Sequence, residues 1–188
     1  MAVELEVPAG INAHMSMEIH PVPWPHGRAQ QFEAGRLAAA AALAAAGSAD
    51  RVVPRDPDGR PRFPPGFPGS ISHTEHLAVT VVVPGAEAVG VDIENAVVTE
   101  RMARFVFSER ERRTLLAPVG AYLPGELFAA KEAAFKALNG LGALGDFAFW
   151  RIGLSRSGGV LTASYRKESL PVWVRSQADL SLAVAIRR

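Results

Sequence analysis

Cysteine is absent from this chain of 188 residues, which excludes disulfide frameworks, cysteine-ligated zinc sites, iron–sulfur clusters and thiol nucleophiles. No apolar run reaches the roughly 18 residues that a membrane-spanning helix needs. Residues 1–10 contain acidic side chains and no basic one, unlike the start of a signal peptide. The net charge is only +1, which argues against a broad basic face for nucleic acid. These absences predict a cytoplasmic protein that binds neither membranes nor nucleic acid.

The remaining composition is that of an ordinary globular chain, with 48% hydrophobic and 21% charged residues. The length suits one domain of ~100–200 residues, or two small halves that share a core. Strands and helices do not alternate regularly, so we expect an α+β fold rather than a doubly wound sheet. Apolar periodicity, cap residues and Pro–Gly clusters predict helices over 29–46 and 126–138, short helices from Thr99 and Ser108, loops over 21–28 and 51–69, and strands over 77–83, 89–94, 147–154, 160–165, 172–174 and 180–186.

Two acidic side chains share one face of the strand predicted over 89–94. Asp92 and Glu94 are two positions apart, which puts their Cα atoms about 7 Å apart on the face opposite Val91. Gly90 precedes them on the same face and leaves room for close approach. Like charges so near repel each other unless water or a cation lies between them. An exposed edge strand with solvated acids is the alternative interpretation.

A third carboxylate, Glu132, falls within the apolar stripe of the helix predicted over 126–138. It lies four residues after Phe128 and three before Phe135, so it shares their face. An unpaired buried charge is costly, and Lys136 is a candidate partner one turn later. An exposed Glu–Lys pair, worth only about 0.3–0.5 kcal/mol, is the alternative.

Asp92, Glu94 and Glu132 together provide only hard oxygen donors, which suit Mg²⁺ or Mn²⁺ rather than zinc or copper. Magnesium sites of this kind keep waters and take phosphate oxygens of a substrate as further ligands. Lys131 and Lys136 flank Glu132 and are natural partners for phosphate. The residues therefore predict a divalent-metal site that acts on a polyphosphate.

The segment Ser70-Ile71-Ser72-His73 follows the Pro–Gly-rich loop and precedes a strand. A turn with polar residues is the plainest interpretation. A serine hydrolase is disfavoured because the G-x-S-x-G elbow is absent. The chain also has no G-x-x-x-x-G-K-[ST] loop, and the glycines of 139–145 follow a helix, the wrong context for dinucleotide binding.

Three sequence blocks, in this order, resemble the signature motifs of 4′-phosphopantetheinyl transferases. The likeness is to the surfactin-type branch and, within it, to the enterobactin synthase component D group. It runs from about Arg28 to the C-terminus, and Gly59-Arg60-Pro61 and Ala34-Gly35-Arg36 also fit. The three blocks are Ser70-Ile71-Ser72-His73-Thr74, Gly90-Val91-Asp92-Ile93-Glu94 and Phe128-Ala129-Ala130-Lys131-Glu132-Ala133-Ala134-Phe135-Lys136.

The resemblance implies an α+β monomer of two similar halves related by a pseudo-twofold, here residues 1–95 and 96–188, with coenzyme A held between them. It implies transfer of the phosphopantetheine group from coenzyme A to a serine of an apo acyl or peptidyl carrier protein, releasing adenosine 3′,5′-bisphosphate. Such an enzyme needs Mg²⁺, with Mn²⁺ as a possible substitute.

The same resemblance implies a role for each matching residue. Asp92, Glu94 and Glu132 hold the metal, and Glu132 also acts as the base for the carrier serine. Lys136 offsets charge on the phosphates. Ser72 and His73 contact the phosphates of coenzyme A, and His73 lies beside the reacting centre. Arg36 and Arg60 bind the 3′-phosphoadenosine end. Lys131 is a further phosphate partner.

The chain departs from the family pattern in two places. Residues 39–42 are alanines where relatives often have arginines, so possible phosphate contacts are missing. Phe128 stands where the third block often has a tryptophan. Arg28, Arg51 and Arg55 are the candidates to replace the missing charge.

Two other functions use the same residues: a coenzyme A- or carrier-binding module without transfer, and a Mg²⁺-dependent phosphohydrolase. For a carrier partner we expect the surface of residues 99–117, which carries several arginines. Its apolar residues are Phe105, Phe107, Leu115 and Leu116. The alternative is that these residues belong to the core.

Overall fold

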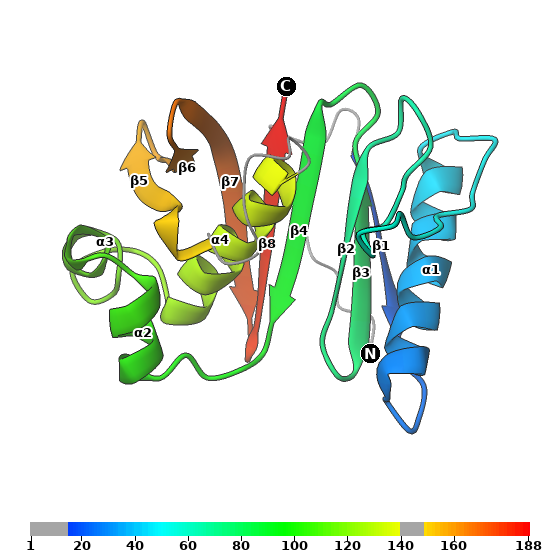
Figure 1. The fold of residues 1–188 in the computed structure, drawn as a ribbon. Helices are drawn as coiled ribbons and strands as arrows, with labels where there is room; N and C mark the ends of the chain where they lie inside the picture. The colour runs from blue at the N-terminus through cyan, green and yellow to red at the C-terminus, as the bar shows by residue number, and fades with distance from the viewer. Residues whose placement is uncertain (1–14, 140–148) are drawn as a thin grey trace.

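The computed structural model describes residues 15–139 and 149–188 (Figure 1). Its helices are α1 (Arg28–Ala45), α2 (Glu100–Val106), α3 (Glu109–Thr114) and α4 (Pro124–Asn139), with a 3₁₀ turn η2 (Phe149–Arg151). Its strands are β1 (Ser16–Pro21), β2 (Gly69–His73), β3 (Leu77–Val82), β4 (Ala88–Glu94), β5 (Gly153–Ser157), β6 (Val160–Tyr165), β7 (Glu168–Gln177) and β8 (Leu180–Arg187).

Two antiparallel sheets divide the described chain. The N-terminal sheet has the order β1-β3-β2, and the C-terminal sheet has the order β4-β8-β7-β6-β5. Helix α1 packs on the first sheet and α4 on the second, so each half combines one sheet with one long helix (Figure 1). The predicted α+β class is therefore confirmed.

The alternation of side chains along β3 gives the small sheet two apolar faces. Val79 and Val81 pack against Val91 of β4 and Val184 of β8, which joins the two sheets. Val82 points to the other side, where it meets the alanine-rich face of α1. The layers are therefore α1, the small sheet, the large sheet and α4, with cores between them.

Helix α4 lies unusually close to β4 because small residues face each other. A Cβ atom on Gly90 would lie 1.8 Å from the carbonyl oxygen of Ala133, so only glycine fits there. Gly90 therefore faces α4, and alternation turns Asp92 and Glu94 to the same side. Val91 faces the other side, in the core between the sheets. The predicted division of this strand into two faces is confirmed.

Several elements differ from those predicted. β1 and β2 were not expected; both pair with β3, a contact between distant segments that local sequence does not encode. The strand expected over 147–154 is instead the turn η2 followed by β5, and residues 147 and 148 lie outside the described residues. β7 is longer than the expected 172–174 because it pairs along both β6 and β8.

The sheets also divide the chain at a different point from the predicted boundary at residue 95. Strand β4 pairs with β8 and so belongs to the C-terminal sheet, which places the division between β3 and β4. β2 and β4 are the edge strands of their sheets and lie side by side. Among the described residues, no helix combines the length and apolar character that crossing a membrane requires.

Candidate active site

A buried hydroxyl joins the two sheets where β2 meets β4. Ser72 of β2 donates a hydrogen bond from Oγ to Asp92 Oδ1 at 2.8 Å, and its Oγ accepts the backbone N–H of Ile93 at 3.3 Å. Asp92 is only 7% exposed. A carboxylate at this depth needs partners, and Ser72 supplies one from the opposite half of the molecule.

Helix α4 supplies the second partner of Asp92. Lys136 Nζ lies 2.7 Å from Asp92 Oδ1 and also donates to the carbonyl oxygen of Val91 at 2.9 Å. The close approach at Gly90 puts the helix within reach of this strand. Because an ammonium group has three hydrogens, one remains for a further acceptor.

Glu132 lies one turn before Lys136 and is half-buried. Burial raises the pKa of its carboxyl, the negative charges of Asp92 and Glu94 raise it further, and the charge of Lys136 opposes them. The carboxylates of the strand and of the helix are thus close enough to influence one another, as the sequence predicts. The most buried face of α4 consists mainly of alanines, so Glu132 flanks the apolar stripe rather than lying within it.

The three carboxylates do not form a closed metal cage. Glu94 Oε1 accepts the N–H of Ala96 at 2.7 Å, which turns it toward its own loop. Within residues 15–139 and 149–188, no three His, Cys, Asp or Glu side chains are arranged to hold a metal ion. The donor chemistry nevertheless fits Mg²⁺, which is commonly held by one or two carboxylates, waters and the phosphates of a substrate.

A second feature is a cavity of about 460 Å³ between α1 and the Pro–Gly-rich loop. Arg28, Arg36 and Arg55 line it together with His73. The guanidinium carbons of Arg36 and Arg55 lie 4.5 and 4.7 Å from the centre of the Phe32 ring. Burial and then the charge of Arg55 lower the pKa of Arg36. Converging like charges favour an anionic ligand.

The cavity lined by Arg28, Arg36 and Arg55, called the arginine pocket below, contains a buried polar atom and a histidine with a shifted pKa. In the part of the chain that the structure describes, the Arg36 Nε is buried without a hydrogen-bond partner. Burial, followed by the charge of Lys136, lowers the pKa of His73, while Asp92 and its own backbone oppose this. His73 thus connects the arginine pocket electrostatically with the carboxylate cluster. Of the arginines proposed as replacements, Arg51 is not among the residues that line the cavity.

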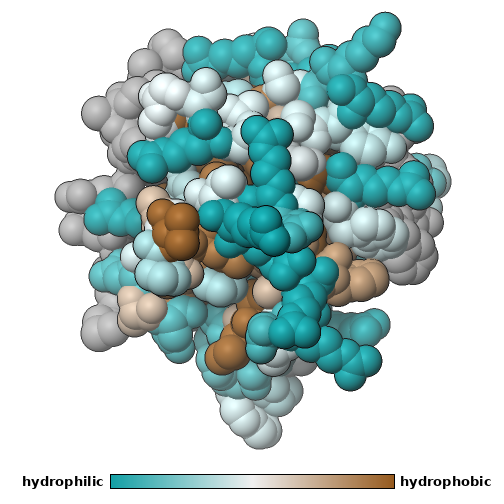
Figure 2. Space-filling model, turned by 90° about the vertical axis from the view of Figure 1, so that its left-hand side faces the viewer, coloured by the Kyte–Doolittle hydropathy of each residue, from teal (hydrophilic) through white to brown (hydrophobic). Residues whose placement is uncertain are grey.

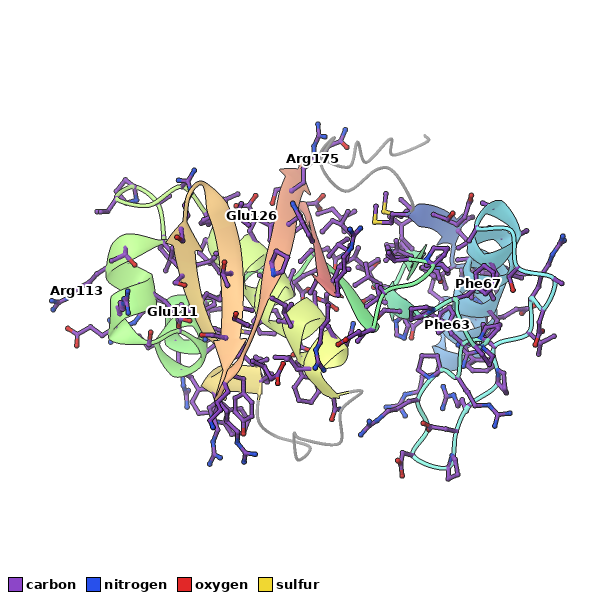
Figure 3. The ribbon with its side chains drawn as sticks, turned by 90° about the horizontal axis from the view of Figure 1, so that it is seen from above. Phe63, Phe67, Glu111, Arg113, Glu126 and Arg175 are labelled. Carbon is purple, nitrogen blue, oxygen red and sulfur yellow. The ribbon has the colours of Figure 1, made fainter. Side chains whose placement is uncertain are left out.

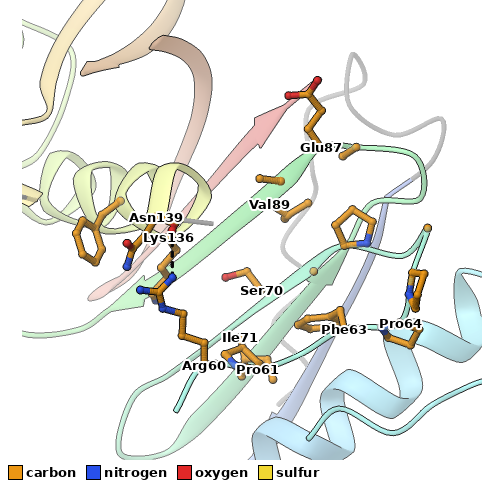
Figure 4. A pocket seen from close by; sticks show the side chains of 17 residues that line it. Arg60, Pro61, Phe63, Pro64, Ser70, Ile71, Glu87, Val89, Lys136 and Asn139 are labelled. Carbon is orange, nitrogen blue, oxygen red and sulfur yellow. Dashed lines mark hydrogen bonds between the residues drawn. The ribbon is translucent and has the colours of Figure 1, made fainter. Parts of the chain in front are cut away.

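A larger cavity of about 600 Å³ adjoins the arginine pocket across Pro61 and Ile71, which line both. Arg60 extends over it and donates from Nη1 to the carbonyl oxygen of Asn139 at 3.1 Å (Figure 4). Lys136 lines the same cavity from α4. The two cavities therefore run from the arginines to Lys136, between the two halves.

The structure does not bring Lys131 to these cavities. Its side chain is 1% exposed, and its Nζ pairs with Glu111 at 3.0 Å and donates to the carbonyl oxygen of Val106. Glu111, labelled in Figure 3, is 2% exposed and also accepts the N–H of Leu154. The expected phosphate contact is wrong for Lys131, because successive residues of a helix point in different directions.

Phe32 and Glu111 take part in these contacts but were not predicted from the sequence. Phe32 supports both Arg36 and Arg55, and its position four residues before Arg36 on a helix was a usable signal. Glu111 forms a capping box with Ser108 at the start of α3. Nothing local shows that the same carboxylate also neutralises Lys131.

The described residues bring an arginine-lined cavity and a cavity lined by Lys136 together between two α+β halves, with Asp92 hydrogen-bonded to Lys136. This combination is typical of proteins that bind phosphate-rich ligands. Comparison with protein families agrees. Residues 17–83 match the 4′-phosphopantetheinyl transferase N-terminal domain, and residues 88–186 match the 4′-phosphopantetheinyl transferase superfamily. The chain belongs to the 4′-phosphopantetheinyl transferase superfamily. Comparison with curated proteins gives no match.

Proposed function

We propose that this protein transfers the 4′-phosphopantetheine group of coenzyme A to a serine of an apo acyl or peptidyl carrier protein. Membership of the superfamily supports phosphopantetheine transfer in general. The observation that carries the proposal is the juxtaposition of the arginine pocket with the cluster of Asp92, Glu132 and Lys136. Such a pair of sites suits a ligand with a phosphate at one end and a reactive diphosphate at the other.

In this proposal coenzyme A lies across the two cavities in one direction. Arg28, Arg36 and Arg55 would bind the 3′-phosphate, with the adenosine against Phe32 and Pro61. His73 and the free hydrogen of Lys136 would then meet the diphosphate. The resemblance implies that Arg60 lies at the 3′-phosphoadenosine end. In the proposed arrangement Arg60, which lines the larger cavity with Lys136, would instead cover the ligand from the loop side.

Asp92 and Glu132 are the residues that would hold Mg²⁺ or Mn²⁺, with Glu94 joining them if it releases Ala96. The metal would neutralise charge on the diphosphate during displacement. Asp92 keeps one oxygen, Oδ1, for Ser72 and Lys136, so its other oxygen is the one for the metal. Lys136 carries the remaining positive charge on the protein side.

Glu132 is the proposed base for the carrier serine. The serine oxygen would attack the phosphorus next to the pantetheine arm, and its proton would pass to Glu132. The bond from that phosphorus to the bridging oxygen breaks, and adenosine 3′,5′-bisphosphate leaves with the electron pair. A raised pKa makes a carboxylate a better proton acceptor near neutral pH, which supports this role for Glu132.

The carrier would dock on the face formed by α2 and α3. Phe105 is 72% exposed, and its ring lies 5.9 Å from Trp150, so an aromatic patch stands out among charged side chains. Figure 2 shows apolar patches among hydrophilic residues on this side of the molecule. Phe107 and Leu115 are buried in the core, so the alternative interpretation holds for these two residues. A partner with acidic groups would suit the surrounding arginines.

The specific group within the superfamily, surfactin-type and related to enterobactin synthase component D, is also a proposal and rests on the three sequence blocks. That the enzyme works as a monomer in the cytoplasm stays a prediction from the sequence.

One assay tests the transfer. Purified protein, coenzyme A, Mg²⁺ and an apo carrier are incubated, and the carrier is weighed by mass spectrometry. A gain of the phosphopantetheine mass supports the proposal. Coenzyme A bound without any gain, across several carriers, would indicate a binding module, and coenzyme A cleaved without a carrier would indicate a phosphohydrolase. Asp92→Asn should abolish the gain, while Asp179→Asn, an exposed turn residue, should leave it unchanged.

A further inference from the structure

The hydrogen-bonding capacity of Ser72 is already used within the protein. A hydroxyl has one hydrogen to donate, and that of Ser72 goes to Asp92 Oδ1 at 2.8 Å. A lone pair of the same oxygen accepts the N–H of Ile93 at 3.3 Å. Ser72 is also 7% exposed, so it has little access to a ligand. The side chain therefore has no donor left for a phosphate.

Asp92 shows what these bonds achieve. Its Oδ1 accepts from Ser72 on one side and from Lys136 on the other, at 2.8 and 2.7 Å. Two bonds to one oxygen, from different elements, fix the plane of the carboxylate. They leave the other oxygen, Oδ2, unoccupied by these two donors. A carboxylate held in this way is pre-oriented for a single-oxygen contact with a cation.

We propose that Ser72 is a positioning residue that orients Asp92 for metal binding, and is not a contact for the phosphates of coenzyme A. The inference rests on the proposed function for the metal. The hydrogen bond from Ser72 to Asp92 also couples the halves of the molecule, because Ser72 lies on the N-terminal sheet and Asp92 on the C-terminal sheet. The proposed role departs from what the resemblance implies for this serine, and the two roles predict different measurements.

The test compares Ser72→Ala with Ser72→Thr. Mn²⁺ binding is measured by electron paramagnetic resonance with the full chain and coenzyme A but no carrier, so that no turnover occurs. Coenzyme A binding without metal is measured separately by calorimetry. Substitution of a residue that orients a metal ligand typically lowers metal affinity by about 10- to 100-fold. Ser72→Ala should therefore weaken Mn²⁺ binding about tenfold or more and leave metal-free coenzyme A affinity unchanged.

Ser72→Thr keeps the hydroxyl and adds a methyl group that a strand tolerates, so it should restore Mn²⁺ affinity. Thr80→Val is the matched control for loss of a buried hydroxyl, since Thr80 donates to the carbonyl oxygen of Gly35, on the face of the sheet that meets α1. It should leave Mn²⁺ binding at the wild-type value. If Ser72→Ala does not fold, Ser72→Cys replaces it, and its weak S–H donor should give an intermediate affinity.

Each other result overturns the inference. A Ser72→Ala variant, or in its place Ser72→Cys, with wild-type Mn²⁺ affinity would show that Asp92 does not depend on this hydroxyl. A loss confined to metal-free coenzyme A binding would make Ser72 a phosphate contact. If the wild-type protein itself does not bind Mn²⁺, the metal is removed from the proposed function as well. This result is seen in wild type, whereas the first two are seen only in the variants.

Discussion

At the scale of single residues, the carboxyl of Glu132 is where stability and activity conflict. Its folded pKa is raised, so the ionised form is disfavoured in the folded protein relative to the unfolded chain. The stability linked to this group is therefore complete below its unfolded pKa of about 4.3–4.5 and is lost as the pH rises through the folded value. A group kept under this penalty is typical of a functional site.

Replacing Glu132 by Gln should stabilise the protein at pH 7 and abolish transfer. The melting temperature should rise by about 2–4 °C for each kcal/mol gained in a chain of this size. The gain should shrink toward zero as the pH is lowered to 4, where the wild-type carboxyl is protonated too. Activity should fall by about 100-fold or more, as for loss of a general base. A variant that is less stable than wild type at pH 7, or keeps a tenth of the activity, contradicts this account.

His73 reports on the same cluster from the other half. Burial and the nearby charge of Lys136 lower the pKa of its ring, so it should titrate below the ordinary value of about 6.5 in the free protein. Binding of adenosine 3′,5′-bisphosphate brings negative charge to the ring and should raise that pKa. NMR titration of the ring protons, assigned with His73→Asn, checks both shifts. No change on binding would place the phosphates elsewhere.

At the scale of elements, one buried ion pair fastens the helices of the C-terminal half. Lys131 of α4 and Glu111 of α3 are 1% and 2% exposed, and Glu111 also accepts the N–H groups of Ser108 and Leu154. The pair therefore joins α3, α4 and β5. It lies one residue from Glu132 in sequence but on another side of the helix.

Lys131→Met should destabilise the fold by about 3–5 kcal/mol, because it leaves Glu111 buried without its counter-charge. Adding Glu111→Gln should recover part of the loss, since the amide is neutral and its oxygen still accepts a backbone N–H. Chemical unfolding measures both, with Lys167→Met, an exposed turn residue, as the control. At a temperature where Lys131→Met is folded, its KM for coenzyme A should equal that of wild type. A raised KM of Lys131→Met for coenzyme A would indicate that Lys131 contacts the phosphates after all.

Local sequence predicts the elements that are formed by contacts between neighbouring residues, and it fails for those that depend on contacts with distant segments. The helices of 28–45 and 124–139 and the strand of 88–94 carry their own periodicity, and all three were predicted. β2 depends on pairing with β3, so its polar residues looked like a turn. The two-faced pattern of β4 predicted that Asp92 and Glu94 share a face, but the bonds that hold Asp92 come from Ser72 and Lys136, far away in sequence.

At the scale of the whole molecule, the proposed function has the two halves contribute different ends of one ligand site. The arginine pocket is built by α1, β2 and the loop of the N-terminal half. The carboxylates and Lys136 come from β4 and α4 of the C-terminal half. Neither half contains both, so binding of coenzyme A should depend on their packing through the valine core. Substitutions at one end should then affect affinity and those at the other end chemistry.

The arginine pocket gives the sharpest test of this division. Arg36→Ala and Arg55→Ala should each raise the KM for coenzyme A by about tenfold or more, the effect of losing a charge-assisted hydrogen bond of ~1.5–3 kcal/mol. Neither should change the KM for 3′-dephospho-coenzyme A, which lacks the group they bind, and kcat should change little because the reacting phosphorus lies at the other end.

Arg51→Ala is the matched control, because Arg51 is exposed on the same segment but is not among the residues that line the pocket. Steady-state kinetics with both substrates decide the matter. If all three arginine variants behave alike, the effect is one of general positive charge. If wild-type enzyme uses the two substrates with equal KM, the pocket does not bind the 3′-phosphate, and the direction in which coenzyme A lies across the two halves must be reversed.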